Sequence, residues 1–300
     1  MGKSFYSNDG VWLKANIHSH TTVSDGAFTP LELGKLYAEA GYDVLSMTDH
    51  NLFVPHSELP KDMILLPTGV EHDIEYSPNK CTHIIGIGAK GKVSTTYDCR
   101  RYSKDELSDQ QLINMMKNDG QFVVLAHPFW SRMKPDEVLT LNNFDAIEVY
   151  NNGTEHLCHH GNAEIYWELL LQQGKRIFAT ACDDVHCADD LFGGWIWLKA
   201  RNRTSEAVID ALHEGHFYAS SGPKIFDFHV ENNEVYISCS PCREIHFVAY
   251  EPRGKSFFAE EKQELTEGKF TLKKTEKYVR AVCVDFNGKT AWTNPIYFDM

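Results

Sequence analysis

Short hydrophobic runs alternate with amphipathic stretches or polar connections along the first two thirds of the chain. The runs predict buried strands over residues 11–17, 43–48, 63–70, 82–88, 121–126, 145–150, 176–181 and 194–199. The amphipathic stretches predict helices over residues 29–40, 108–119, 162–173 and 204–214. Strands that alternate with helices are typical of βα units around a parallel sheet, and seven or eight such strands favour a closed barrel.

The pattern of hydrophobic and polar positions changes near residue 222. Beyond Ser220–Pro223, hydrophobic and polar positions alternate in short runs over residues 225–230, 234–238, 244–250, 269–272, 277–284 and 291–298. Asn-Asn, Pro-Arg-Gly and Asn-Gly turns separate these runs, which predicts about six strands in a small all-β sandwich. We therefore expect two domains, a barrel over residues 1–222 and a C-terminal sandwich over residues 223–300.

Composition narrows the class of protein. The chain has 300 residues and a formal net charge of −13, so the basic surface that long nucleic acid requires is missing. No hydrophobic run is long enough to span a membrane, and the first ten residues contain no secretory signal. The eight cysteines form no disulfide framework, so we expect reduced thiols in a cytoplasmic protein. The isolated C-x-x-C at Cys239 and Cys242 is interpreted as turn chemistry in preference to a zinc site.

Histidines and carboxylates gather near the ends of the predicted strands. His18 and His20 follow the first strand and face the same side because they are two residues apart; Asp184 and His186 repeat this arrangement. In chain order, the candidate metal ligands are His18, His20, Asp25, His50, Glu71, His83, His127, Asp184 and His186. The carboxyl ends of barrel strands meet at one face, and six imidazoles with three carboxylates suit Zn, Mn or Fe. Nine protein ligands are too many for one ion and, with a bridging carboxylate, suit three.

Some positions leave an alternative open. Asp73 and Glu75 are rivals of Glu71, because residues two apart share one face of a strand. Asp183 is a rival of Asp184, although Asp184 has the spacing that shares a face with the following histidine. The histidines expected in a loop near the mouth of the barrel, outside the ligand set, are His156, His159 and His160.

The ordered motifs H-x-H, S-D-G, T-D-H-N, G-x-E, H-x-x-G, A-H-P and D-x-H, from Trp12 to Gly222, resemble those of the polymerase and histidinol phosphatase (PHP) family of metal-dependent phosphoesterases. The resemblance implies a distorted (β/α)7 TIM-like barrel with a trinuclear site at its carboxyl face. It implies one ion on His18, His20 and Asp184, a bridge through Glu71 to a second ion on His83 and His127, and a third ion on Asp25, His50 and His186. Residues 215–222 and the β module are similar to the carbaryl-hydrolase-like branch, which is not uniformly phosphatase.

The resemblance implies hydrolysis of a small phosphate ester by a metal-activated hydroxide. The alternatives are hydrolysis of a carboxylic or carbamate ester or an amide at the same site, and a non-catalytic metal-binding accessory protein. Glu71, Asp184 and His186 are expected to act in catalysis as ligands, and Arg132 as a contact for an anionic substrate. Further candidates for substrate contact are Arg100, Arg101 and Lys104, and those for a supporting group or general acid are Asp49, His72 and Asp183.

Overall fold

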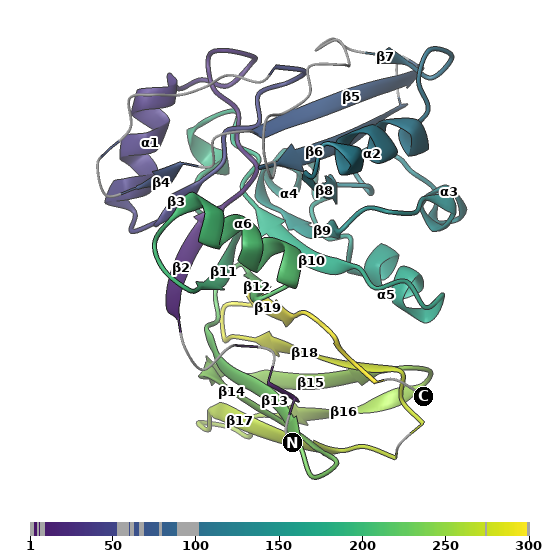
Figure 1. Ribbon diagram of the computed structural model, residues 1–300. Coiled ribbons are helices and arrows are strands. Elements are labelled where there is room, and N and C mark those ends of the chain that lie inside the picture. Colours follow the sequence, from purple (N-terminus) through teal and green to yellow (C-terminus); the bar gives the residue numbers. More distant parts are fainter. Residues whose placement is uncertain are drawn as a thin grey trace.

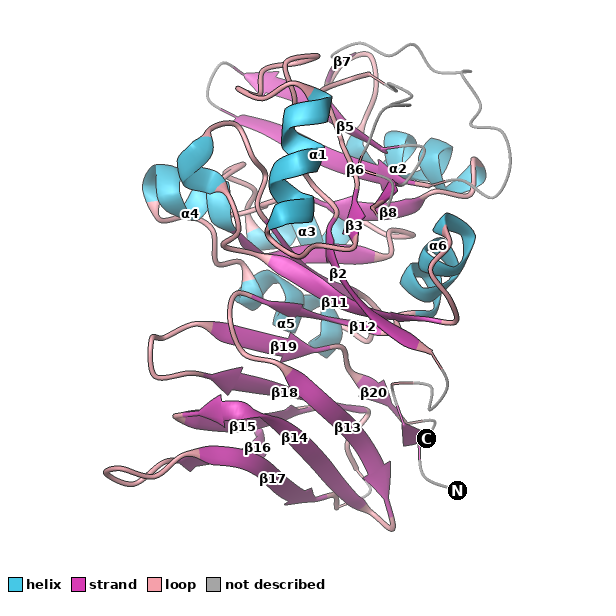
Figure 2. Ribbon diagram, turned by 90° about the vertical axis from the view of Figure 1, so that its left-hand side faces the viewer, coloured by secondary structure: helices cyan, strands magenta, loops and turns pink. Residues whose placement is uncertain are grey.

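The computed structural model describes residues 3, 4, 6, 10–52, 60, 63–65, 69–77, 80–88, 102–273 and 275–298. Over these residues the molecule has two regions: one in which helices cover mixed sheets, and one built from strands (Figure 1). A view turned by 90° separates the same two regions (Figure 2). Among the described helices, none is long and apolar enough to cross a membrane.

The helices of the described residues are α1 (Pro30–Glu39), α2 (Asp109–Asn118), α3 (Pro135–Thr140), α4 (Asn152–Cys158), α5 (Glu164–Gln172) and α6 (Ser205–Glu214), with a 3-10 turn η1 (Ala188–Asp190). The four predicted helices are confirmed as α1, α2, α5 and α6. Thr29 caps α1 reciprocally with Glu32: each side chain accepts a hydrogen bond from the other residue's backbone N–H. Helices α3 and α4 were not predicted, because six and seven residues are too few to show a clear helical period.

One sheet contains six strands in the order β10 (Phe178–Cys182), β9 (Ala146–Asn151), β8 (Phe122–Leu125), β6 (Lys80–Ile87), β5 (Gly69–Ser77) and β7 (Tyr102–Ser103). Strands β8, β9 and β10 run parallel, as predicted. The prediction of a parallel sheet is wrong for β6, which is antiparallel to both β5 and β8. Only two residues separate β5 from β6, and a connection that short can join only antiparallel strands.

The reversed direction of β6 explains the position of His83. This histidine is the fourth of the eight residues of its strand, and Glu71 also lies inside a strand, whereas the other candidate ligands follow strand ends. Because β6 is antiparallel to β8, the beginning of β6 lies beside the end of β8, where the N–H of Ala126 donates to the carbonyl of His83. His83 therefore reaches the same edge of the sheet as His127.

The predicted strand over residues 63–70 is wrong in its bounds. The chain instead forms β4 (Ile64–Leu65) and the longer β5, so Glu71 lies inside a strand rather than after one. Glu71 and Asp73 alternate with His72 along β5 and therefore share one face. This placement brings Asp73, the expected rival of Glu71, to the same side of the sheet.

A second sheet of ten strands follows the path β16 (Arg253–Phe258), β15 (Glu244–Ala249), β18 (Tyr278–Val284), β19 (Thr290–Thr293), β12 (Phe217–Ser220), β11 (Trp195–Ala200), β2 (Val11–Asn16), β3 (Val44–Leu45) and β4, with β20 (Ile296–Tyr297) paired to β18. A third sheet has the order β1 (Lys3–Ser4), β13 (Ile225–Glu231), β14 (Glu234–Cys242) and β17 (Leu265–Thr271). The pairing of β12 with β19 makes the ten-stranded sheet continuous across residue 222. The division into domains at that residue stays a prediction.

Two parallel bridges connect the six-stranded and ten-stranded sheets. One joins Ser19 to Val185, and the other joins His50 to Glu71. Backbone hydrogen bonds accompany them: the N–H of His20 donates to Val185 at 3.1 Å, and that of Asn51 donates to Glu71 at 2.8 Å. The segments that follow β2, β3 and β10 therefore meet the beginning of β5 at one place.

Separate hydrophobic cores pack against these sheets. One core lies among β2, β6, β8, β11 and α6, and another lies beneath α2, α3 and α5. A further core fills the space between the four-stranded sheet and the part of the ten-stranded sheet that contains β15, β18 and β19. Glu71 and His83 lie within strands and the other candidate ligands follow strand ends, so rigid elements hold them in place.

Candidate metal centre

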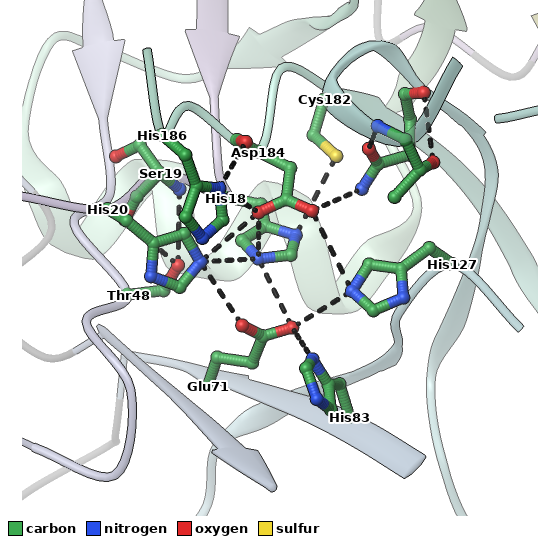
Figure 3. A network of polar contacts seen from close by, with 12 residues as sticks. His18, Ser19, His20, Thr48, Glu71, His83, His127, Cys182, Asp184 and His186 are labelled. Carbon is green, nitrogen blue, oxygen red and sulfur yellow. Dashed lines mark hydrogen bonds and ion pairs between the residues drawn. The ribbon is translucent and has the colours of Figure 1, made fainter. Parts of the chain in front are cut away.

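His18, His20, Glu71 and Asp184 form the most buried group of candidate ligands (Figure 3). Five contacts join their imidazole nitrogens and carboxylate oxygens, each 3.1 to 3.3 Å long. A tetrahedral ion with ligand distances of about 2.0–2.1 Å holds its ligand atoms roughly 3.3–3.4 Å apart. The four side chains therefore have the spacing of a metal site.

Two carboxylate oxygens of this group have no hydrogen-bond donor among the described residues. They are Oε2 of Glu71 and Oδ1 of Asp184, and both are buried. Each lies 3.1 or 3.2 Å from Nε2 of His20, so acceptors and imidazole nitrogens converge on one point. An unsatisfied buried acceptor is costly, and a cation at that point would satisfy both oxygens.

A second group of side chains also contacts Glu71. Nδ1 of His50 lies 3.2 Å from Oε2 of Glu71, and Nδ1 of His83 lies 3.0 Å from Oε1. His127 approaches the same Oε1 at 3.2 Å. Asp73 completes the group, with Oδ1 2.8 Å from His50. Glu71 therefore touches two sets of histidines, which is the arrangement expected of a bridging carboxylate.

The third group lies nearer to solvent. Oδ2 of Asp25 lies 3.5 Å from Nε2 of His50, and Oδ1 lies 3.5 Å from Nε2 of His186. Oδ1 of Asp25 is also 3.7 Å from Nδ1 of His20. The side chain of Asp25 is 54% exposed and that of His186 is 39% exposed. These residues therefore form the solvent-facing side of the cluster.

The electrostatic balance of the buried group follows from these contacts. Burial alone would raise the pKa of Glu71 and Asp184, but the adjacent imidazoles hold both pKa values well below the usual range. Burial likewise lowers the pKa of His18 and His83, yet the carboxylates raise both well above the ordinary value. Without metal, His18 and His83 therefore hold protons that a divalent cation would displace.

Supporting side chains orient the candidate ligands, and sequence reasoning missed them. Oε1 of Glu148 accepts from Nδ1 of His18 at 2.7 Å, and Oε2 accepts from the backbone N–H of His127 at 2.9 Å. Asn151 donates to Oε2 of Glu148 and to Oδ2 of Asp184. Carboxylates that accept from ligand histidines are common around metal sites. The available signal was an acidic residue inside the otherwise hydrophobic run over 146–149.

Three expected general acids prove to have structural contacts. Asp49 accepts from the backbone and hydroxyl of Thr21 and from the hydroxyl of Ser24, and thus shapes the turn that carries Asp25. Asp183 is buried and accepts from three consecutive backbone N–H groups, those of residues 192–194. His72 lies on the opposite face of β5 from Glu71, and burial lowers its pKa to about 4. None of the three lines the cavity described below.

A cavity of about 920 Å³ opens onto the cluster. Seven of the nine candidate ligands line it, and the exceptions are the deeply buried His18 and His20. Its walls include the cationic side chains of Lys80 and Arg132 and the apolar side chains of Trp130 and Leu157. The cavity can therefore receive a molecule with both an anionic and an apolar part.

Arg132 and His127 belong to the same turn. The N–H of Ser131 donates to the carbonyl of His127, and the Ser131 hydroxyl lies 3.1 Å from Nδ1 of that ring. Arg132 follows with a left-handed φ of 60° and lines the cavity. Of the other expected substrate contacts, Lys104 lies over the Tyr76 ring and does not line the cavity, whereas Arg100 and Arg101 lie outside the described residues.

Of the three histidines expected in a loop, His156 lies in a helix instead, whereas His159 and His160 follow the end of that helix. His156 lies in α4 and lines the cavity. His159 caps the end of α4 in the left-handed region, and its ring contacts Glu155. Nε2 of His160 lies 3.5 Å from Nη1 of Arg132. Of these three rings, that of His156 lines the cavity and those of His159 and His160 do not.

The comparisons with known proteins concern the fold. No protein-family model and no curated protein matches the chain. The structure is similar to a two-domain protein from Bacteroides vulgatus ATCC 8482 that contains a predicted PHP-like metal-dependent phosphoesterase, with 15% identity, 97% of each chain covered and a TM-score of 0.54. The expected similarity to PHP-like metal-dependent phosphoesterases is therefore confirmed at the level of the fold, whereas the closed barrel and closeness to the carbaryl-hydrolase-like branch stay predictions.

Two further structures are more distant. An amidohydrolase from Chromobacterium violaceum is 14% identical over 58% of this chain and 88% of that chain, with a TM-score of 0.42. A proposed metal-dependent phosphoesterase from Bifidobacterium adolescentis ATCC 15703 is 16% identical over 61% of this chain and 90% of that chain, also with a TM-score of 0.42. Similarity at this level carries no argument about the site.

Proposed function

We propose that the protein is a metal-dependent hydrolase of the PHP type that acts on a small phosphate ester. The observation that carries the proposal is the convergence of nine histidine, aspartate and glutamate side chains in one cluster, with ligand-like spacing in the buried group and seven of the nine lining one cavity. The resemblance of the ordered motifs and the similarity of fold to the Bacteroides vulgatus protein support it. We also propose that the strands joined through Ser19–Val185 and His50–Glu71 correspond to the expected distorted barrel.

The centre would hold three divalent transition-metal ions, Zn, Mn or Fe. His18, His20 and Asp184 would hold the first ion. Glu71 would bridge it to the second, because its carboxylate lies 3.3 Å from His18 of the first set and 3.0 Å from His83 of the second. His83 and His127 would complete the second ion. Asp25, His50 and His186 would hold the third. Asp73 competes for a place in this set, because its carboxylate touches His50 and lies 3.7 Å from His83.

Divalent ions bound in such a centre lower the pKa of a coordinated water and polarise the oxygens of an ester. The protein's own part is to hold the ligands in place before substrate arrives. Glu148 fixes the ring of His18, and Ser131 fixes that of His127. Arg132 supplies a cation at the cavity wall that would orient a phosphate group.

Hydrolysis of a carboxylic or carbamate ester, or of an amide, is the second candidate. The apolar side chains of Trp130 and Leu157 at the cavity wall favour it, since they suit a substrate with an uncharged organic group. Leu157 is 71% exposed, so its contact area remains available. For this second candidate, the same side chains would hold the metal ions, and Arg132 would contribute less to substrate binding.

The decisive experiment is an assay of the Mn- or Zn-loaded protein on phosphomonoesters, phosphodiesters, carboxyl esters and carbamates. We expect turnover of a phosphate ester that disappears in Asp184→Asn. Turnover of uncharged esters alone would support the second candidate. Absence of turnover on every substrate, by protein with a full complement of metal, would favour the non-catalytic accessory protein.

A further inference from the structure

Three cysteines meet in the strand-only region, far along the chain from the candidate metal centre. Cys239 and Cys242 lie on β14, and Cys283 lies on β18. All three are free thiols, with exposures of 2%, 0% and 0%. Their sulfur atoms all lie within 4.8 Å of one another. Within the described residues, this group contains no imidazole or carboxylate.

An irregularity in β14 puts the first two thiols on the same face. Residues three apart on a regular strand point to opposite sides of a sheet. Burial in β14 alternates regularly as far as Cys239, but the next buried residue is Cys242. The pairing of β14 with β17 shifts its register between Ser238 and Cys242, as a bulge does. The bulge therefore turns Cys242 inward beside Cys239.

The third thiol comes from the opposite sheet. Strand β14 belongs to the four-stranded sheet, whereas β18 belongs to the ten-stranded sheet. All three cysteines are members of the core between these sheets. The three sulfurs thus meet across the interface between two sheets.

We propose that Cys239, Cys242 and Cys283 form a closed site for a thiophilic d10 cation, Zn²⁺ or Cu⁺, which links the two sheets. Thiolates select these metals over the harder ions that suit carboxylates. Zinc–sulfur distances of about 2.3 Å place thiolates roughly 3.8–4.0 Å apart, within the limit that the three sulfurs satisfy. The site is structural, because its burial leaves no access for a substrate. It is independent of the function proposed above.

Two metal ions serve as probes of the site under anaerobic, reducing conditions. The metal-stripped protein is titrated with Cu⁺, or with Co²⁺ as a stand-in for Zn²⁺ beyond the three equivalents that the candidate metal centre would hold. Sulfur-to-metal charge-transfer absorption is the readout, because the nitrogen and oxygen ligands of the other centre do not produce it. We expect the absorption in wild type and in the control Cys158→Ala, which removes an exposed thiol elsewhere. We expect its loss in the double variant Cys239→Ala/Cys242→Ala.

A second measurement needs no variant and decides the matter should the double variant fail to fold. The wild-type protein is alkylated in mild denaturant, with and without added Zn²⁺ or Cu⁺. Mass spectrometry then identifies the cysteines that have been labelled. We expect the ion to protect Cys239, Cys242 and Cys283 together, while the exposed Cys158 and Cys187 react in both cases. Equal labelling with and without either ion, or charge-transfer absorption that persists in the double variant, would overturn the proposal. The preferred ion, Zn²⁺ or Cu⁺, is the one that gives protection at the lower concentration.

Discussion

Glu148 accepts a hydrogen bond from Nδ1 of His18 at 2.7 Å, and both side chains are fully buried. The bond directs Nε2 of His18 toward Asp184, 3.1 Å away. Cys182 donates to the same oxygen of Glu148 at 3.0 Å. A buried carboxylate behind a candidate ligand sets the tautomer and orientation of the ring before any ion arrives.

Replacement of Glu148 by glutamine tests this relationship. Both oxygens of Glu148 accept hydrogen bonds, from His18 on one side and from the N–H of His127 on the other. The amide can accept on one side only and must present its NH₂ group to a donor on the other. We expect metal affinity to fall roughly 10–100-fold, as it does for other supporting residues. Calorimetric metal titration measures the loss. An affinity equal to that of the distant control Glu234→Gln would contradict the orienting role.

Asp184→Asn should remove both turnover and metal at the buried group. Its Oδ1 faces His18 and His20, and an amide cannot supply the same negative charge there. We expect a larger loss of activity than the roughly 10–100-fold effect of a supporting residue. Circular dichroism should show a retained fold, since Asn151 still has an oxygen to which it can donate. Full activity in this variant would exclude Asp184 as a ligand.

The metal-free protein should lose stability as pH rises toward 9. Burial lowers the pKa of His186, but the hydrogen bond to Asp25 and the charge of Asp184 outweigh it and raise the pKa to about 9 from 6.5. A raised folded pKa contributes stability that is fully present below the unfolded value and is lost as pH rises through the folded value. The pKa values of His18, His50 and His83 are raised as well.

Urea unfolding of chelator-treated protein between pH 6 and 9.5 measures this loss. Asp25→Asn should weaken the pH dependence, because His186 loses its partner. Metal binding should show the opposite trend and tighten with rising pH, since the ion must displace these protons. Metal-free protein whose stability increases steadily over this interval would contradict the electrostatic description of the cluster.

Arg132→Gln separates the two substrate classes. A hydrogen bond to a charged group contributes about 1.5–3 kcal/mol, which corresponds to roughly a 10- to 150-fold change in kcat/KM. We expect that loss on phosphate esters and little change on uncharged esters. Lys104→Gln is the matched control, because Lys104 is also cationic but does not line the cavity. Equal effects of the two substitutions would remove Arg132 from the substrate site.

Local spacing explains which parts of the site the sequence can predict. His18 and His20, like Asp184 and His186, are two residues apart, so their shared orientation follows from the period of extended chain. Thr29 and Ser108 likewise signal the starts of their helices through their own neighbours. Such features depend on interactions within a few residues.

Contacts between distant segments explain what sequence reasoning missed. Glu148 is 130 residues from His18, and only the tertiary fold brings β9 and the segment that follows β2 together. The direction of β6 depends on the strands with which it pairs. The hydrophobic run that contains His83 therefore could not show why this histidine reaches the other candidate ligands. Asp73 and Glu71 share a face, and the choice between them depends on the position of His50.

The number of Mn²⁺ ions bound per chain tests the central claim most directly. Manganese suits carboxylate and imidazole ligands, whereas thiolates select Zn²⁺ or Cu⁺, so the cysteine cluster should not contribute to the count. Elemental analysis of Mn-saturated, gel-filtered protein should find about three ions per chain, as nine ligands arranged around a bridging carboxylate require. The variant Asp25→Ala/His186→Ala should bind one ion fewer. A reproducible single ion in the wild-type protein would contradict the trinuclear centre.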